Sequence, residues 1–200
     1  QYFTPRALIS AMVDVTQPKP LQTIGDPSCG TGGFFLAAHD YIQSSNPNLN
    51  PDEKKFLMEK TFHGWDIVPE VTRLCAMNMY LHGIGSIESQ VKNEDSLIGD
   101  PGNRFDVIMT NPPFGKKSTV TIFSDEGKAE KDTMSYERDD FWTTSSNKQL
   151  NFIQHIKTLL KVNGKCAVVV PDNVLFEGGA GEIVRKKLLE QCNLHTMLRL

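Results

Sequence analysis

The stretch Asp26-Pro27-Ser28-Cys29-Gly30-Thr31-Gly32-Gly33-Phe34 connects a short apolar run, Leu21 to Ile24, with the helix-like segment Phe35 to Ile42. A strand, a glycine-rich turn and a helix in this order form the first unit of a parallel α/β sheet. Glycines let the backbone approach a ligand closely, and the N-terminus of the following helix favours negative charge. The stretch therefore predicts a ligand site, of the kind that binds nucleotides, at the carboxyl end of the first strand.

Further strands and helices alternate along the rest of the chain. The first helix is expected to begin at Thr4-Pro5-Arg6, because Thr caps free N–H groups and Pro suits the first helical position. Later strands are expected at Thr61 to Trp65, Ser89 to Lys92, Phe105 to Thr110, Cys166 to Val170 and His195 to Leu200, and later helices at Glu53 to Glu59, from Pro69 to Gly83, from Asn151 to Asn163 and at Glu182 to Gln191. Strands that are apolar throughout indicate a mostly parallel sheet with helices on both faces. We expect a Rossmann-like α/β fold in one domain, residues 1–200.

The spacing of the glycines excludes two common nucleotide sites. A dinucleotide fingerprint requires Gly or Ala where Phe35 stands, and a phosphate loop ending at Gly115-Lys116 requires glycine where Thr110 stands. Asp26, placed before the glycines, would repel a phosphate but suits the ammonium group of an amino-acid-bearing cofactor. S-adenosylmethionine is such a cofactor.

Acidic residues also follow the next two expected strands. Asp66 ends the second strand, where acids accept hydrogen bonds from ribose hydroxyls in nucleotide-binding sheets. Asp95 follows the third and is expected to accept from an adenine amino group, with Leu97 beside the ring. For Asp95, a role as a solvated loop acid stays equally open.

The stretch Asn111-Pro112-Pro113-Phe114 follows the fourth strand. Proline ends strand pairing, so Asn111 is presented at the edge of the sheet where ligands bind. The Asn111 side-chain oxygen and the Pro112 carbonyl are two acceptors that suit one amino group, and Phe114 offers a flat face for a planar ring. Taken alone, the tetrapeptide also suits an ordinary turn.

Composition limits the remaining functions. The 200 residues, with 39% hydrophobic and 22% charged residues, suffice for one substantial core. The net charge of −3 is not typical of a nucleic-acid binder. If the substrate is DNA, much of the binding to its phosphate backbone comes from outside this chain. The four cysteines and five histidines have no metal-ligand or disulfide spacing, and no apolar run suits a membrane span. We expect a cytoplasmic protein without a metal site, excised from a longer chain because it starts at Gln1 without Met.

The segment from Gly115 to Lys148 mixes charged residues with Ser and Thr and lacks hydrophobic periodicity. A loop of this length next to a catalytic turn commonly closes on substrate. If the substrate is DNA, we expect the segment to be mobile without it and to order over a flipped base when the duplex is bound. A stable surface excursion packed by Phe123, Tyr136, Phe141 and Trp142 is nearly as well supported for its second half.

The chain resembles the catalytic core of N6-adenine DNA methyltransferases with the gamma-class motif order, and especially the modification subunit of type I restriction-modification systems. The resemblance rests on Gln1-Tyr2-Phe3-Thr4-Pro5-Arg6, Asp26 to Phe34, Asn111 to Phe114, Asn147 to Phe152, Gly164-Lys165 and Pro171. It implies a class I S-adenosylmethionine-dependent methyltransferase fold, here truncated before its last antiparallel strand. It also implies an N-terminal helical domain and C-terminal segments in the longer protein.

The resemblance further implies methyl transfer from S-adenosylmethionine to N6 of a flipped adenine in double-stranded DNA, with Asn111, Pro112 and Phe114 as catalytic residues. The implied cofactor residues are Phe3, Thr4 and Pro5, which close over the methionine part, and Asp26, Ser28, Gly30, Thr31, Gly32, Gly33, Phe34, Asp66, Asp95 and Leu97. A specificity subunit would supply the target sequence, and a restriction subunit would complete the complex. Two alternatives stay open: a methyltransferase for protein glutamine amides, and a cofactor-binding assembly module without catalysis.

Overall fold

The computed structural model of the protein describes residues 3–85, 90–115, 118–123, 129–134 and 136–199, with side chains outside 118–134. These residues form two compact units, Gln1–Pro113 with Leu159–Val169, and Phe114–Thr158 with Val170–Leu200. The boundary between the units falls inside the Asn-Pro-Pro-Phe stretch, after Pro113.

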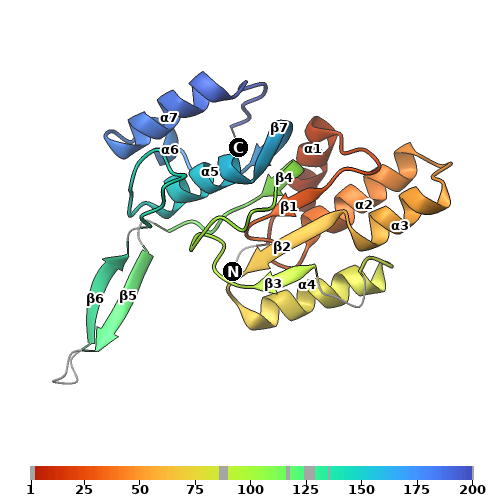
Figure 1. Cartoon of the computed structure of the whole chain (residues 1–200), viewed down its shortest axis with the longest axis horizontal. Coiled ribbons are helices and arrows are strands. Elements are labelled where there is room, and N and C mark those ends of the chain that lie inside the picture. The colour runs from red at the N-terminus through yellow and green to blue at the C-terminus, as the bar shows by residue number, and fades with distance from the viewer. Residues whose placement is uncertain (1–2, 86–89, 116–117, 124–128, 135, 200) are drawn as a thin grey trace. The chain divides into compact units, whose positions relative to one another are not determined.

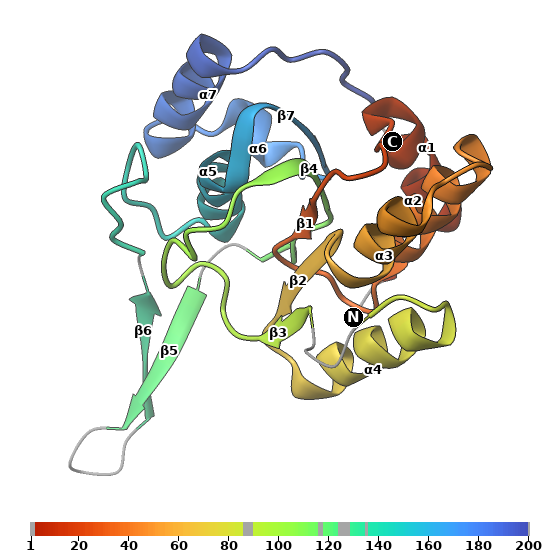
Figure 2. The ribbon, with the colours of Figure 1, turned by 45° about the vertical axis from the view of Figure 1, so that its right-hand side comes forward.

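The first unit is built on a five-stranded sheet with the order β3-β2-β1-β4-β7 (Figures 1 and 2). Its strands are β1 (Ile24–Asp26), β2 (Phe62–Asp66), β3 (Val91–Asn93), β4 (Phe105–Thr110) and β7 (Leu160–Val168). Each neighbouring pair is parallel, which confirms the predicted sheet. Because β1 lies between β2 and β4, the carboxyl ends of these strands meet where the strand order reverses, and ligands bind at such a point.

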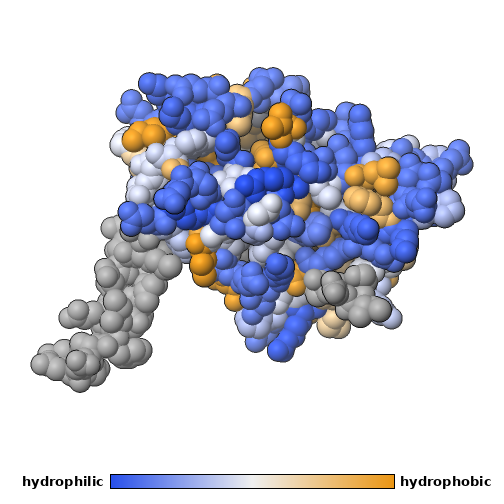
Figure 3. Space-filling view, in the orientation of Figure 1, coloured by the Kyte–Doolittle hydropathy of each residue, from blue (hydrophilic) through white to orange (hydrophobic). Residues whose placement is uncertain are grey.

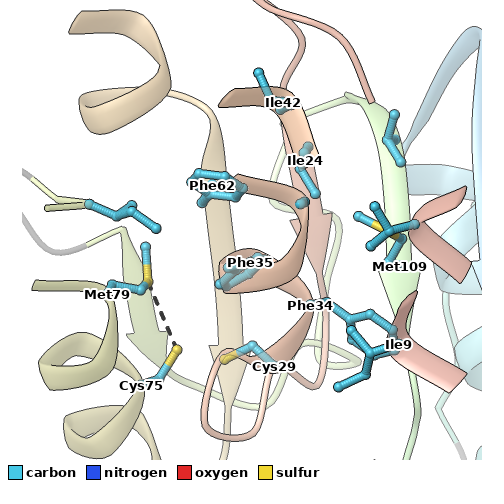
Figure 4. Packing of buried hydrophobic residues seen from close by; sticks show 14 of the residues in the cluster. Ile9, Ile24, Cys29, Phe34, Phe35, Ile42, Phe62, Cys75, Met79 and Met109 are labelled. Carbon is cyan, nitrogen blue, oxygen red and sulfur yellow. Dashed lines mark hydrogen bonds between the residues drawn. The ribbon is translucent and has the colours of Figure 1, made fainter. Parts of the chain in front are cut away.

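Four helices belong to the same unit: α1 (Arg6–Thr16), α2 (Gly33–Ser45), α3 (Pro51–Glu59) and α4 (Pro69–Leu81). Helices α1, α2 and α4 bury Ile9, Phe35 and Cys75 in one core with Phe62 of β2 and Met109 of β4 (Figure 4). The Phe35 and Phe62 ring centroids are 5.5 Å apart. Burying each large apolar side chain contributes roughly 1.5–3 kcal/mol, so this core holds the glycine turn rigidly between β1 and α2.

The starts of β1 and β7 differ most from the predictions. Strand β1 begins at Ile24, because Leu21 has a left-handed φ of 62° and Thr23 donates both its N–H and its hydroxyl to the Asp106 carboxylate. Strand β7 begins at Leu160, well before the expected start at Cys166. The preceding helix, α5 (Lys148–Leu159), ends before the expected stop at Asn163. Asn163, with φ 64°, instead lies in the stretch of β7 where the register against β4 shifts.

Strand β3 starts at Val91, and the described Gln90 is not part of it. The predicted start, Ser89, falls outside the described residues. The prediction for β4, by contrast, has the observed bounds, Phe105–Thr110.

The second unit contains an antiparallel hairpin of β5 (Ser118–Phe123) and β6 (Ala129–Met134), most of α5, and helices α6 (Asn173–Phe176) and α7 (Ala180–Gln191). Its small core consists of Leu150 and Ile153 of α5, Val174 of α6 and Val184 of α7, with Trp142 packed against them. The prediction of α7 at Glu182 to Gln191 is confirmed apart from its earlier start.

The segment from Gly115 to Lys148 has more structure than its lack of periodicity predicts. It contains the β5–β6 hairpin, and a bridge joins Tyr136 to Ser145. Thr143 exchanges two hydrogen bonds with the Gln154 side chain of α5, at 3.0 and 3.1 Å. The second half of the segment is therefore packed on α5, as the alternative of a stable excursion requires. Closure of the segment over a substrate base stays a prediction.

The predicted strand at His195 to Leu200 is wrong for its described residues, 195–199, which form neither helix nor strand. A strand requires a partner for its backbone groups, and these described residues pair with none. Leu194, Met197 and Leu198 are exposed, so the apolar run is not buried either.

No helix in the described ranges has both the length and the apolar character needed to cross a bilayer. The face in Figure 3 is largely hydrophilic, with small, separate hydrophobic patches.

Candidate active site

Asp26 is the last residue of β1 and its side chain is buried. One carboxylate oxygen accepts a hydrogen bond from the Ser28 N–H at 2.9 Å. Burial raises the pKa of Asp26 to about 7, although hydrogen bonds from the Thr110 hydroxyl and the Ser28 N–H act to lower it; the charge of Asp66 adds a smaller increase. An acid in this state is poised to ionise when a cation approaches.

The backbone of the glycine turn is left-handed at two positions. Gly30 and Gly32 have φ values of 55° and 83°, which other residues rarely adopt. A Cβ atom at Gly32 would lie 2.9 Å from the Cys75 Sγ atom, whereas one at Gly30 would meet nothing within 4 Å. The turn is thus closely packed on α4 at Gly32 and open at Gly30.

Two residues outside the predicted site donate hydrogen bonds to backbone carbonyls of the turn. Asn78 of α4 donates to the Thr31 carbonyl at 3.0 Å, and Ser96 donates to the Pro27 carbonyl at 2.8 Å. The sequence signal for Asn78 is that it shares one helical face with Val71 and Cys75, both of which are buried.

Asp66 ends β2 and reaches the glycine turn, as predicted for a strand-end acid. One oxygen accepts from the Gly30 N–H at 3.2 Å, and the other accepts from the Val68 N–H at 2.9 Å. Each carboxylate oxygen keeps a further lone pair for a ligand. The structure therefore brings Asp26, the turn and Asp66 together.

Other predicted cofactor residues have mainly structural contacts. Asp95 accepts from the Leu97 N–H at 3.0 Å, and the Leu97 side chain is fully buried. Phe34 lies in the core beside Ile9, and a Cβ atom at Gly33 would lie 3.0 Å from the same isoleucine (Figure 4). These contacts fix the start of α2 and the loop after β3.

Asn111 follows β4 directly, and its amide is held at one end. The Nδ2 group donates to the Thr4 hydroxyl at 3.0 Å, while the buried Oδ1 atom has no hydrogen-bond partner among the described residues. A buried carbonyl oxygen without a partner costs roughly 1–3 kcal/mol, which a ligand donor would recover. The neighbouring Pro112 is buried.

Thr4 does not cap α1, so that prediction is wrong. The N-cap position is occupied by Pro5, and no side chain caps the helix. The Thr4 hydroxyl is bonded to Asn111 instead. Two aromatic residues of the predicted site, Phe3 and Phe114, are 77% and 59% exposed, which leaves their rings accessible to a ligand.

The N-6 DNA methylase family matches the whole chain, residues 1–200. The chain belongs to this family. Among curated relatives, it is 38% identical to the type I restriction enzyme EcoKI methylase subunit of Escherichia coli and to the StySPI methylase subunit of Salmonella potsdam, each across all of this chain. The chain spans 36% of the length of either relative.

Solved structures agree with this membership of the N-6 DNA methylase family. The crystal structure of the EcoKI M protein superposes with a TM-score of 0.79 at 37% identity, covering 94% of this chain and 38% of that one. A structure from work on complex assembly of the type I R-M system has a TM-score of 0.80 at 32% identity, covering 96% and 37%. The fold is therefore the Rossmann-like methyltransferase fold.

Within this N-6 DNA methylase chain, the polar groups gather after β1, β2 and β4. Asp26 and Asp66 flank an open glycine turn, and the Asn111 acceptor lies at the end of the neighbouring strand. The arrangement can hold a cation beside Asp26 and an amino group beside Asn111.

Proposed function

We propose that this chain is the catalytic core of a type I modification subunit, which transfers a methyl group from S-adenosylmethionine to N6 of adenine in DNA. The observation that carries the proposal is the Asn111 amide, whose buried Oδ1 atom has no hydrogen-bond partner within the described ranges, while Thr4 accepts a hydrogen bond from its Nδ2 group. An acceptor in this state suits an amino group. The family membership makes a nucleic-acid amino group the favoured one.

The residues after β1 and β2 fit S-adenosylmethionine. The buried Asp26 suits an ammonium group, Gly30 leaves open space above the turn, and Asp66 has lone pairs for ribose hydroxyls. When bound, this cofactor supplies a methyl group on a sulfonium centre. We assign Asp26, Ser28, Gly30, Thr31, Gly32 and Asp66 to this site, with Phe3, Thr4 and Pro5 closing over the methionine part.

The chemistry assigned to this chain is positioning of the adenine amino group. The Asn111 Oδ1 atom and the Pro112 carbonyl accept from N6–H, which favours a tetrahedral nitrogen whose lone pair is free to attack. Adenine inside a duplex is out of reach, so the base must be flipped and stacked, a role we assign to the exposed Phe114. In-line placement of the amino group supplies much of the rate.

The proposed partners are double-stranded DNA, a specificity subunit and, in the complete system, a restriction subunit. Relatives that match this chain over its full length are named type I restriction enzyme methylase subunits. The net charge of −3 fits a complex in which a separate subunit with a basic surface contacts the phosphate backbone of the DNA.

Transfer of radiolabelled methyl groups tests the proposal. The full-length protein is incubated with tritiated S-adenosylmethionine and DNA, with and without its specificity subunit, and the DNA is digested to nucleosides. We expect label in N6-methyladenine only when both subunits are present. Label in a glutamine-containing peptide but not in DNA would favour the protein methyltransferase, and cofactor binding without transfer to either would favour the assembly module.

A further inference from the structure

We propose that Thr4 is a positioning residue for the methyl acceptor: its hydroxyl anchors the Asn111 amide so that the Oδ1 atom faces the adenine amino group. This inference deepens the proposed function and rests on it. It assigns to Thr4 a role toward the target base, in addition to the closure over the cofactor that the family resemblance implies.

The anchoring bond joins two segments that are 107 residues apart in the sequence, from Thr4 Oγ1 to Asn111 Nδ2 at 3.0 Å. An Asn side chain has one donor end and one acceptor end. Because Thr4 occupies the donor end, the acceptor end is left for a ligand, and none of the described residues hydrogen-bonds to that buried oxygen. Without the anchor, the Asn111 amide can rotate and present its own NH₂ group to the adenine amino group, and two donors do not form a hydrogen bond.

Thr4 is itself held in place by a rigid neighbour. Pro5, with φ −59°, is the N-cap of α1, and its carbonyl accepts from the Leu8 and Ile9 N–H groups at 3.0 and 3.1 Å. Ile9 and Val13 fix α1 in the core. The Thr4 hydroxyl therefore meets Asn111 from a preorganised position, which an accurately placed catalytic amide requires.

A helix-capping role for Thr4 is the simplest competing explanation. The structure does not support it, since no side chain caps α1. Loss of the hydroxyl should accordingly affect turnover much more than the stability of the fold.

The test compares Thr4→Val with Thr4→Ser in the full-length protein assembled with its specificity subunit. Valine keeps the shape without the hydroxyl, and serine keeps the hydroxyl. We expect Thr4→Val to lower kcat at saturating S-adenosylmethionine by about 10- to 100-fold, whatever its effect on the Kd for the cofactor, and Thr4→Ser to keep kcat within about threefold of the parent. Thr4→Ala should behave like Thr4→Val, which guards against a folding defect specific to valine.

A double-mutant cycle shows whether Thr4 acts through Asn111. In single-turnover reactions, Thr4→Val should have less than about a twofold effect when Asn111→Ala is already present. Equal turnover of the Val and Ser variants, or a loss caused only by weaker cofactor binding, would overturn the inference and leave the proposed function intact. A parent protein that transfers no methyl group to DNA would overturn the proposed function, and the inference with it.

Discussion

The hydroxyl groups of Ser28 and Thr110 lie 2.8 Å apart, which joins the turn after β1 to the last residue of β4. Thr110 precedes Asn111 and also hydrogen-bonds to Asp26. The proposed cofactor turn and the proposed methyl-acceptor site therefore share one network across two parallel strands. Substituting Asp26 should mainly affect cofactor binding, whereas substituting Asn111 should mainly affect turnover.

Replacing Asp26 with Asn should make the free protein more stable at neutral pH. The pKa of Asp26 is raised to about 7 from 3.8, so the folded state holds a proton that the unfolded state has released between those values. Folding stability therefore falls as the pH rises from about 4 to about 7. Removing this cost should raise the free energy of unfolding at pH 8 by about 2–4 kcal/mol, with a smaller gain at pH 5. Urea denaturation at both pH values measures it, with the exposed Asp14→Asn as control.

The same Asp26→Asn variant should bind S-adenosylmethionine at least about tenfold more weakly at pH 8, because it loses the charge that faces the ammonium group. In the parent protein, affinity should increase with pH up to and slightly beyond 7, as Asp26 ionises. Calorimetric titration at several pH values measures both effects. Unchanged affinity in the variant would remove Asp26 from the cofactor site.

Replacing Asn111 with Ala should lower methyl transfer by about 100-fold or more, while cofactor affinity stays within a few-fold. The reason is that the Asn111 Oδ1 atom is assigned to the adenine amino group, whereas Asp26 and Asp66 are assigned to the cofactor. Single-turnover transfer and calorimetry on the same preparation measure the two quantities. Near-normal turnover would exclude Asn111 from the mechanism.

Substitution of Gly30 and Gly32, the left-handed glycines of the turn, should separate the effect of backbone strain from that of crowding. Gly30→Ala should cost roughly 1–2 kcal/mol, the strain of a left-handed alanine. Gly32→Ala should cost roughly 1–3 kcal/mol more, because its Cβ atom would lie 2.9 Å from the Cys75 Sγ atom. Chemical denaturation gives both values. Adding Cys75→Ala to Gly32→Ala should recover part of the difference, and an unchanged difference would show that crowding is not the cause.

Gln154→Ala should release the segment around Thr143 from α5. The Gln154 side chain binds both backbone groups of Thr143, so its loss should speed amide hydrogen exchange at residues 141–145 by about tenfold or more. Gln149→Ala is the matched control, because Gln149 is buried on the same helix but its side-chain oxygen has no hydrogen-bond partner in the described part of the chain. Exchange that is already fast in the parent would show that this half of the segment is mobile, as its sequence first suggested.

The amino-acid sequence alone determines the order of the elements in the first unit and the strand ends that carry the proposed site. Apolar runs that stop at Asp26, Asp66 and Asn111 are local features, and β4 has the predicted bounds, Phe105–Thr110. Prolines and glycines mark these stops because their effect on the backbone depends on the residue itself. The glycine turn and the Asn-Pro-Pro-Phe stretch, to which we assign the cofactor and the methyl acceptor, are therefore predictable without knowledge of any contact.

Tertiary structure alone decided which partner each polar or apolar group takes. The Thr4 hydroxyl suits a helix cap by its sequence position, yet it binds Asn111, because the packing of α1 brings it there. His195 to Leu200 has the composition of a strand, but its described residues lack a neighbour to pair with. The raised pKa of Asp26 has the same origin, since burial, which no local pattern encodes, withdraws its carboxylate from water.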